Sequence, residues 1–474
     1  MKKQITWKKI KSETRSVWGG ETKSFPDGAT QTPTVNSVAY AYKDLDEWEK
    51  VSKGDKPGHI YGRNTNPTVS VLEEKIRILE DAEAATSFSS GMAAISNILF
   101  ANLKPGDTVV AGKDTYGGTS KIFLEFLPRF DIKVELCDTT DHKLIEQKIN
   151  ENCQLLYLET PTNPTLKIQN IKWLSDIAKK AGALVVVDNT LATPINQSPL
   201  SLGADIVIHS ATKFLCGHSD ALGGLVCGDK DNIHRIFHFR EINGASLAPN
   251  AAYLILRGMK TLALRVEKHN SNALELANWL LNHPKIDQVY YPGLETNSGY
   301  KIAQSQMKGF GGVLSFTLNG EENVIPSFIS KLRFAHAAAH LGSVETIVGP
   351  PKTTSHVENT SEERELLGIP ENMLRCSVGI ENIDDIIDDL DQALIFIDFY
   401  TALEDTITAK RSTLNNLKNG TQGLQNLLQL EMLRKEKELS QNAINHLVEE
   451  DSLKEKVLTY SRWAIGLLLG LIVI

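Results

Sequence analysis

AGALVVVDNTLATP (181–194) and GADIVIHSATKFLCGHSD (203–220) each begin with a short apolar run and end in polar side chains. Such runs, rich in β-branched residues, are typical of strands buried on both faces of a parallel sheet. The first run ends in Asp188, and the second leads to Lys213. Because ligands bind at the carboxyl ends of strands in open parallel sheets, we expect this acid and this amine to face one site. A structural Asp–Lys ion pair is the alternative.

Alternating helices and strands predict the fold class. Between about residues 75 and 250, helical segments punctuated by glycine alternate with the strand-like runs TVVAG, QLLYLET, ALVVVDNT and DIVIHS. This order is typical of an α/β fold with a mostly parallel sheet. After residue 250 a long helical pattern precedes strand-like GVLSFTL and LRCSVGIE, which predicts a smaller α+β domain. We therefore predict an N-terminal arm over 1–60, a large α/β domain over 61–250, a small C-terminal domain over 251–400 and a helical extension over 401–474.

The composition is that of an ordinary globular protein. Of 474 residues, 41% are hydrophobic and 23% are charged, and a net charge of −8 gives no reason to expect nucleic acid as a partner. The five cysteines are odd in number and form no CxxC pair, which predicts a reducing compartment and neither a disulfide framework nor a metal site. No apolar secretory core follows the basic start, so a cytoplasmic location is expected.

The C-terminal extension has a pattern of its own. Residues 421–458 are rich in Leu, Lys and Glu and poor in glycine, which favours a long amphipathic helix or a helical hairpin. The chain is uncharged from Trp463 to Ile474, and a start at Val457 gives nearly the length of a membrane-spanning helix. The alternatives are a solvated helix packed on the rest of the chain, a coiled-coil stalk ending in a membrane or partner anchor, and disorder.

A lysine and an aspartate at strand ends are suited to bind a ligand that carries an aldehyde on a pyridine ring. The lysine forms a Schiff base with the carbonyl, and the aspartate keeps the ring nitrogen protonated so that the ring accepts electrons. Pyridoxal 5'-phosphate is such a cofactor, and its phosphate needs donors. SSGMAAISNILF offers Ser90, Gly91 and Met92 at the start of an apolar helix, where N–H groups favour an anion. Further donors near the strand ends are the hydroxyl groups of Thr190, Ser210 and Thr212.

The order of eight motifs resembles that of one known family. YGRNTNPT, SSGMAA, DTYGGT, ETPTNPTL, VVVDNT, HSATKFLCGHSD, LRGMKTL and LRCSVGIE follow one another as they do in the pyridoxal-phosphate-dependent Cys/Met metabolism family, which includes cystathionine γ-synthase, cystathionine γ-lyase and methionine γ-lyase. The resemblance covers about residues 14 to 400. It implies a cofactor-binding large domain of the aspartate-aminotransferase-like fold type I, and amino-acid substrates.

The resemblance also implies a role for each matching residue. Lys213 is similar to the Schiff-base lysine, which also moves protons between substrate carbons, and Asp188 to the partner of the ring nitrogen. Tyr116 resembles the tyrosine that stacks on the ring, and Asn163 a residue near the ring hydroxyl. Arg375 resembles the arginine that holds the substrate α-carboxylate by a two-point fork. The structural alternatives are a core aromatic for Tyr116, a turn for Asn163 and a surface ion pair for Arg375.

One matching pair implies an oligomer. Tyr61 and Arg63 resemble residues that reach the phosphate from the neighbouring subunit. A homodimer or homotetramer with shared active sites is therefore expected.

Several positions depart from the family pattern, and they concern the substrate. Lys121 stands where relatives often carry an arginine that faces the distal end of the substrate, so an acidic or polar distal group is expected. Where the family usually reads Ser-Leu-Gly-Gly, this chain has HLGS, which begins at His340 and ends at Ser343, and Ala339 replaces the glutamate before it. His340 could donate to the substrate in place of the lost serine, or could fill space. Gly118 stands where methionine γ-lyases carry a cysteine, which disfavours that activity.

The resemblance implies an enzyme of sulfur amino-acid metabolism. The first expectation is γ-replacement of the cystathionine γ-synthase type, in which L-cysteine reacts with an O-acyl-L-homoserine. The second is γ-elimination by a γ-lyase acting on cystathionine or another γ-substituted amino acid, with release of an α-keto acid and ammonia. An inactive, membrane-tethered scaffold is the alternative of another class.

Overall fold

The computed structural model describes residues 6–21, 25, 28–320, 324–418, 431–435 and 437. The chain divides into two compact units, residues 1–391 and 392–474. The helices of the first unit are α1 (Ser12–Trp18), α2 (Leu45–Ser52), α3 (Pro67–Leu79), α4 (Gly91–Asn102), α5 (Gly117–Lys121), α6 (His142–Asn152), α7 (Ile171–Ala181), α8 (Thr193–Asn196), α9 (Lys230–Asn243), α10 (Pro249–Met259), α11 (Leu262–Leu281), α12 (Tyr300–Gln306), α13 (Val324–Ile329), α14 (Ser361–Leu366) and the beginning of α15 (Ile383–Lys418).

A seven-stranded sheet forms the centre of the first unit. Its strands are β1 (Ala84–Phe88), β2 (Thr108–Gly112), β3 (Lys133–Cys137), β4 (Leu155–Glu159), β5 (Leu184–Asp188), β6 (Ile206–Ser210) and β7 (Gly224–Gly228), in the order β1-β7-β6-β5-β4-β2-β3. Only β7 runs antiparallel to its neighbours, β1 and β6. The predicted α/β fold with a mostly parallel sheet is therefore confirmed.

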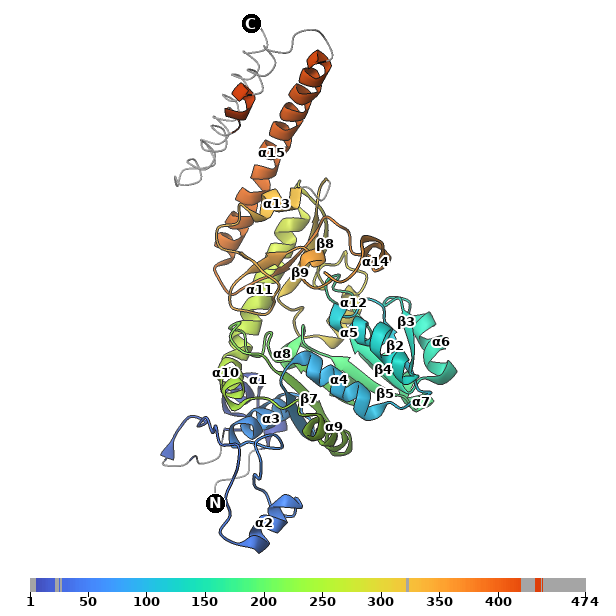
Figure 1. Ribbon diagram of the computed structural model, residues 1–474, viewed down its shortest axis with the longest axis vertical. Coiled ribbons are helices and arrows are strands. Elements are labelled where there is room, and N and C mark those ends of the chain that lie inside the picture. Colours follow the sequence, from blue (N-terminus) through green and yellow to red (C-terminus); the bar gives the residue numbers. More distant parts are fainter. Residues whose placement is uncertain are drawn as a thin grey trace. The chain divides into compact units, whose positions relative to one another are not determined.

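Helices cover both faces of this sheet (Figure 1). Apolar residues of α4 and α9 pack on one face, against side chains such as Val109, Tyr157 and Val186. Helices α6 and α7 cover part of the other face, whose side chains alternate with the first set along each strand, and α3 and α10 cover the rest. Because both faces are buried, the strands read as continuous apolar runs in the sequence.

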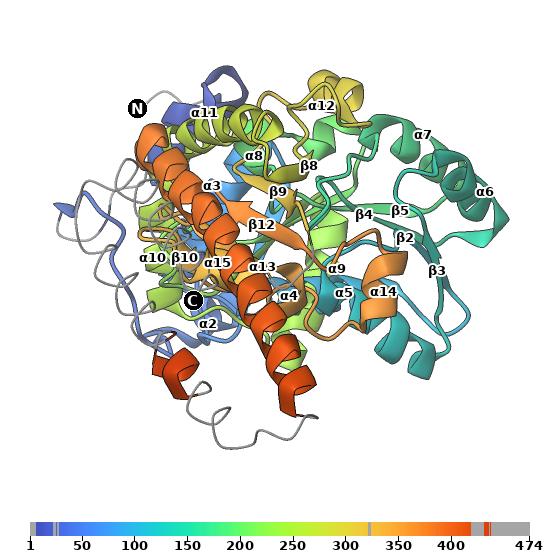
Figure 2. The same cartoon turned by 90° about the horizontal axis from the view of Figure 1, so that it is seen from above.

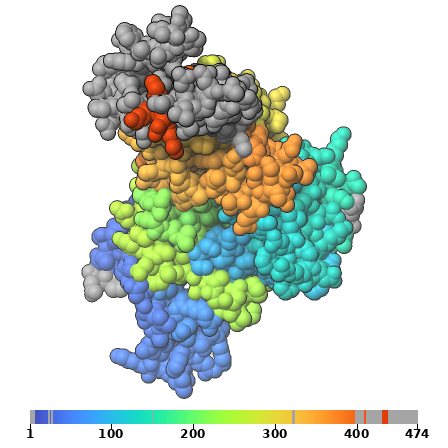
Figure 3. All heavy atoms as spheres, turned by 45° about the horizontal axis from the view of Figure 1, so that its top comes forward, coloured from blue at the N-terminus to red at the C-terminus, as the bar shows by residue number. Residues whose placement is uncertain are grey.

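A smaller mixed sheet follows. Its strands are β8 (Ile286–Tyr290), β9 (Val313–Leu318), β10 (His336–Ala337), β11 (Ile347–Gly349) and β12 (Met373–Ser377), in the order β10-β11-β12-β9-β8. Only β10 and β11 pair in parallel. Seen from above, the segment around α14 lies beside α5 (Figure 2), and a Cβ atom at Gly117 would lie 2.6 Å from the carbonyl oxygen of Ser355. The small sheet thus brings part of its loops to the edge of the large one, as the adjoining orange and teal surfaces also show (Figure 3).

The second unit contains the remainder of α15 and the helical residues 431–435 and 437. Among the described residues, no helix combines the length and the apolar character that crossing a membrane requires. The apolar segment 457–474, for which an anchor is one of the sequence-based alternatives, lies outside the described residues.

Candidate active site

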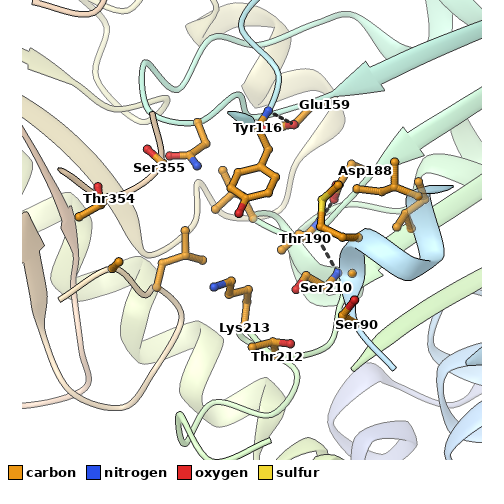
Figure 4. Close-up of a pocket in the computed structure, with 18 of the residues that line it drawn as sticks. Ser90, Tyr116, Glu159, Asp188, Thr190, Ser210, Thr212, Lys213, Thr354 and Ser355 are labelled. Atoms are coloured by element: carbon orange, nitrogen blue, oxygen red, sulfur yellow. Dashed lines mark hydrogen bonds between the residues drawn. The ribbon is translucent and has the colours of Figure 1, made fainter. Parts of the chain in front are cut away.

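One cavity of about 240 Å³ lies where the carboxyl ends of the central strands meet α4 and the loops of the small sheet. Figure 4 shows Tyr116 and Lys213 pointing into it from opposite sides. Of the residues predicted from the sequence, those that line it are Ser90, Gly91, Met92, Tyr116, Asn163, Asp188, Thr190, Ser210, Thr212, Lys213 and Arg375. Residues that are up to 285 positions apart in the chain, from Ser90 to Arg375, therefore surround one space.

The turn that follows β6 places Lys213. Its backbone N–H donates to the carbonyl of Ser210 at 3.1 Å, and its own carbonyl accepts from Gly217 at 2.8 Å, so the residue is held by one short helical turn. Burial and the nearby cation of Arg375 lower the pKa of the Lys213 amine to about 8. An amine in this state is neutral often enough near neutral pH to react with a carbonyl compound.

Asp188 is the last residue of β5 and faces the same cavity. One carboxylate oxygen accepts from the backbone N–H of Thr190 at 3.0 Å, and the other lies 3.4 Å from the hydroxyl of Tyr157 on β4. Thr190 in turn accepts from the backbone N–H of Ser210 at 2.8 Å, which fastens the end of β5 to the end of β6. The acid and the amine are thus presented by neighbouring strands.

Glu159 ends β4 beside Asp188, and sequence reasoning did not select it. Burial, reinforced by the negative charge of Asp188, raises the pKa of Glu159 well above its usual value. Burial also raises the pKa of Asp188, while hydrogen bonds from Thr190 and the electrostatic effect of the nearby His209 oppose that rise. We infer that the negative charge of this buried pair resides on Asp188, because its charged form has the better hydrogen-bond partners.

The start of α4 forms a cradle suited to an anion. Ser90 caps this helix by accepting from the N–H of Ala93 at 3.1 Å, which leaves the first-turn N–H groups of Gly91 and Met92 without helical partners. A Cβ atom at Gly91 would lie 2.8 Å from the Cβ of Ser210, so no larger residue fits between helix and strand. Backbone donors, the helix dipole and nearby hydroxyl groups together suit a phosphate.

Arg375 enters the cavity from β12 of the small sheet. Its Nη1 donates to the side-chain oxygen of Asn163 at 3.0 Å, and its Nη2 donates to the carbonyl of His340 at 3.1 Å. Burial lowers the pKa of Arg375 to about 10, so it stays charged at neutral pH. Two contacts hold its planar fork in one orientation, as binding of a carboxylate requires.

Tyr116 immediately precedes α5, and its backbone N–H donates to Glu159 at 2.8 Å. Thr354 and Ser355 line the cavity beyond its ring (Figure 4), and they too were missed from the sequence. Glu159 could have been found, because it ends an apolar run as Asp188 does. Thr354 and Ser355 could not have been found from the sequence, because their position depends on how a long loop packs.

Five predicted residues lie outside the cavity lining of the single chain. Lys121 pairs with Glu125 at 3.0 Å, and the Ser343 hydroxyl donates to Glu345. Tyr61 is partly exposed, and Arg63 donates to the carbonyl of Glu241. His340 reaches Lys213 instead, with 3.3 Å between its Nδ1 and the lysine Nζ. The substrate contacts predicted for Lys121, His340 and Ser343, and the cross-subunit role predicted for Tyr61 and Arg63, stay predictions.

The residues present fit pyridoxal phosphate. A lysine with a lowered pKa can form the link to the aldehyde, a buried carboxylate can pair with the ring nitrogen, and the narrow cradle at Gly91 can receive the phosphate. Together with the two-sheet architecture, these features define a pyridoxal-phosphate-dependent enzyme of fold type I.

Comparison with known proteins identifies the family. The sequence profile of the Cys/Met metabolism PLP-dependent enzymes matches residues 13–395, and the chain belongs to this family. It is 43% identical over 370 residues to an L-methionine gamma-lyase of Fusobacterium nucleatum subsp. polymorphum, covering 77% of this chain and 94% of the relative. It is 40% identical over 386 residues to a cystathionine gamma-lyase of Bacillus subtilis, covering 81% and 99%. It is 42% identical over 368 residues to the chloroplastic cystathionine gamma-synthase 1 of Arabidopsis thaliana, covering 77% and 65%.

Solved structures are similar over most of the chain. The crystal structure of a cystathionine gamma synthase from Xanthomonas oryzae pv. oryzae in complex with aminoacrylate and cysteine matches with a TM-score of 0.78 and 35% identity, covering 82% of this chain and 99% of that one. A cystathionine gamma-lyase from Lactobacillus plantarum complexed with L-serine matches with a TM-score of 0.77 and 35% identity, covering 82% and 100%. The protein is a PLP-dependent enzyme of the γ-synthase and γ-lyase group, and its similarity is divided between several reactions of that group.

Proposed function

We propose that this enzyme catalyses γ-replacement, in which the sulfur of L-cysteine displaces the acyloxy group of an O-acyl-L-homoserine. The observation that carries the proposal is the presence of Lys213, Asp188 and Arg375 on one cavity of about 240 Å³. An amine, a ring-pairing carboxylate and a carboxylate-binding arginine are what an α-amino acid needs at such a cofactor. The bound cofactor would supply an electron sink for charge that develops at the substrate Cα.

The chain's own groups have distinct roles in this proposal. The Arg375 fork binds the substrate α-carboxylate and so fixes the direction of the amino-acid backbone. Lys213 takes a proton from Cα and also serves the proton transfer at Cβ, for which its lowered pKa is suited. Tyr116, held by Glu159, closes the cavity beside the reacting atoms.

Three observations favour replacement with cysteine. The chain is similar to synthases both in sequence and in structure, and Gly118 stands in place of the cysteine characteristic of methionine γ-lyases. The hydroxyl groups of Thr354 and Ser355 provide polar partners for the acyl group at the far wall of the cavity.

The second candidate is γ-elimination, which the similarity to the lyase of Bacillus subtilis favours. Both reactions need the same groups at Cα and Cβ and differ in whether a thiol or water reacts after the leaving group departs. The arrangement of groups around Lys213 is therefore compatible with both γ-replacement and γ-elimination.

A substrate panel separates the two candidates. Purified enzyme is given O-succinylhomoserine, O-acetylhomoserine, cystathionine or methionine, each with and without cysteine, and both keto acid and cystathionine are measured. We expect cystathionine to be the main product from an O-acylhomoserine with cysteine. Keto acid at an equal rate with and without cysteine would overturn the replacement reaction in favour of elimination.

A labelling control tests the scaffold alternative. Borohydride reduction should attach the cofactor to the peptide that contains Lys213, and Lys213→Ala should abolish both the label and turnover. Lys230→Ala, at an exposed lysine of α9, should change neither. A colourless protein without label at Lys213 would count against any catalytic role.

A further inference from the structure

The loop 339–344 lies directly against the turn that carries Lys213. A Cβ atom at Gly342 would lie 2.6 Å from the backbone nitrogen of Phe214 and 3.0 Å from the carbonyl carbon of Lys213. Gly342 also has a φ of +79°, a region that favours glycine. Two hydrogen bonds fix the loop, from the N–H of Val344 to the carbonyl of Gly217 at 3.0 Å and from the N–H of Gly342 to the hydroxyl of Ser377 at 2.8 Å. His340 is thus held in a defined place relative to the lysine.

His340 contacts both Lys213 and Arg375, two residues that act on the substrate in the proposed function. Its Nδ1 lies 3.3 Å from the Nζ of Lys213, and its backbone carbonyl accepts from Nη2 of Arg375 at 3.1 Å. Burial, together with the charges of Lys213 and Arg375, lowers the pKa of His340 to about 4 against the opposing effect of Glu345. The imidazole is therefore neutral at neutral pH and can accept a hydrogen bond from the lysine without taking its proton.

We propose that His340 is a positioning residue for Lys213, holding the lysine amine through Nδ1 whenever that amine is free of the cofactor. This inference rests on the proposed function, in which the freed amine moves protons at the substrate. An amine on a four-carbon stem has many rotamers, and an acceptor at one fixed point reduces their number. The side chain of His340 acts on Lys213, while the backbone carbonyl of His340 orients Arg375.

The first test measures the amine itself. In the full-length, cofactor-free chain, the rate at which trinitrobenzenesulfonate labels Lys213 is followed by peptide mass spectrometry between pH 6 and 11. His340→Leu removes the acceptor but fills the space, so the ammonium form loses a partner, and the labelling midpoint should fall by about one pH unit from the wild-type value near 8. His340→Asn keeps an acceptor at about the position of Nδ1 and should restore most of the shift.

Turnover by the holoenzyme gives the second readout. We expect His340→Leu to lower kcat by about tenfold or more, because the amine is less well placed. KM should change by less than about twofold, because Arg375 contacts only the backbone of residue 340. His340→Asn should recover most of kcat, and His336→Leu, at an exposed histidine on the preceding strand β10, should change nothing.

Several outcomes would overturn the proposal. If His340 only fills space, the leucine variant will match the wild type in labelling midpoint and kcat, and the asparagine variant will be the impaired one. His340→Met provides a second apolar variant in case the leucine variant does not fold. Labelling needs neither cofactor nor substrate. An unchanged labelling midpoint in His340→Leu would therefore contradict the hydrogen bond between His340 and Lys213 but would not bear on the proposed function. A wild-type enzyme that is inactive on every substrate of the panel would contradict the proposed function instead.

Discussion

At the scale of single residues, Lys213 can capture an aldehyde only after losing its proton, and its surroundings determine when that happens. With a pKa of about 8, about a tenth of the amine is neutral at pH 7. An ordinary lysine would be neutral in only about one molecule in three thousand at that pH. Burial and the cation of Arg375 thus make this amine several hundred times more available.

The first prediction concerns the pH dependence of cofactor capture. We expect the rate at which the cofactor-free chain binds pyridoxal phosphate to rise about tenfold per pH unit up to about pH 8 and then to level off, because the protonated amine predominates below the pKa. Stopped-flow absorbance of the bound cofactor measures this rate. Arg375→Gln should move the plateau to higher pH, since a neighbouring cation is lost, whereas Arg364→Gln on α14 should leave it in place. A plateau only above pH 10 would contradict the lowered pKa.

At the scale of secondary-structure elements, one buried ion network joins the N-terminal helix to the body of the first unit. The ammonium of Lys75 on α3 pairs with Glu21 at 2.7 Å and donates to the carbonyl of Ser16 on α1 at 2.8 Å. Lys260, just after α10, pairs with the other oxygen of Glu21 at 2.6 Å. Lys75 is fully buried, and burial lowers its pKa against the attraction of Glu21. Such a network stabilises only when every member is present.

The second prediction follows from that dependence. Glu21→Gln should lower the free energy of unfolding by about 3 kcal/mol, because Lys75 would be left buried without its counter-charge. Denaturant unfolding of the full chain measures the loss. The double variant Lys75→Met, Glu21→Leu should regain most of it, since no buried charge of that pair remains. Glu49→Gln, which breaks the exposed pair between Glu49 on α2 and Lys53 just after this helix, should cost less than about 1 kcal/mol. Equal losses for Glu21→Gln and Glu49→Gln would contradict the role of burial.

Local sequence patterns predict most of the fold and part of the candidate site. The apolar runs ending in Asp188 and leading to Lys213 predicted neighbouring parallel strands, because burial on both faces leaves a continuous signal in the sequence. The reversed direction of β7 could not be predicted, since a five-residue apolar strand has the same periodicity in either direction. The contact between His340 and Lys213 was also beyond prediction, because it depends on the packing of a loop against a turn 127 residues away.

At the scale of the whole molecule, the family profile ends at residue 395, while the chain continues to residue 474. The 386 residues shared with the cystathionine gamma-lyase of Bacillus subtilis cover 99% of that protein. We propose that 401–474 is an extension separate from catalysis that contacts a membrane or a partner helix.

The third prediction tests this division. A chain truncated after residue 400 should keep kcat/KM within about twofold, because the residues that line the cavity lie between Ser90 and Arg375. Kinetics on the best substrate of the panel measure it. Co-sedimentation of the full-length chain with membranes, without that of the truncated one, would assign the extension to a membrane and not to a partner helix. A tenfold loss of activity in a folded truncated chain would contradict separation from catalysis, and identical sedimentation would exclude the anchor.

The fourth prediction concerns the completeness of the site in one chain. Tyr61 and Arg63 do not line the cavity of their own chain, although the resemblance to the family implies that both reach the phosphate of a neighbouring subunit. If a partner subunit supplies them, Lys213→Ala and Arg63→Ala remove different halves of each shared site. Refolding the two inactive variants together in equal amounts should restore about a quarter of wild-type activity, because half of the dimers are mixed and each mixed dimer has one intact site of two. Activity and native mass of the mixture measure this.

The matched control is a mixture of Lys213→Ala with Asp188→Ala. Both residues line the cavity of the same chain, so every site in that mixture lacks one of them. This mixture should stay inactive, since no arrangement of subunits rebuilds a complete site. Activity in it, or none in the mixture with Arg63→Ala, would contradict a shared site. A quarter of the activity from the first mixture alone would assign Lys213 and Arg63 of each functional centre to different subunits.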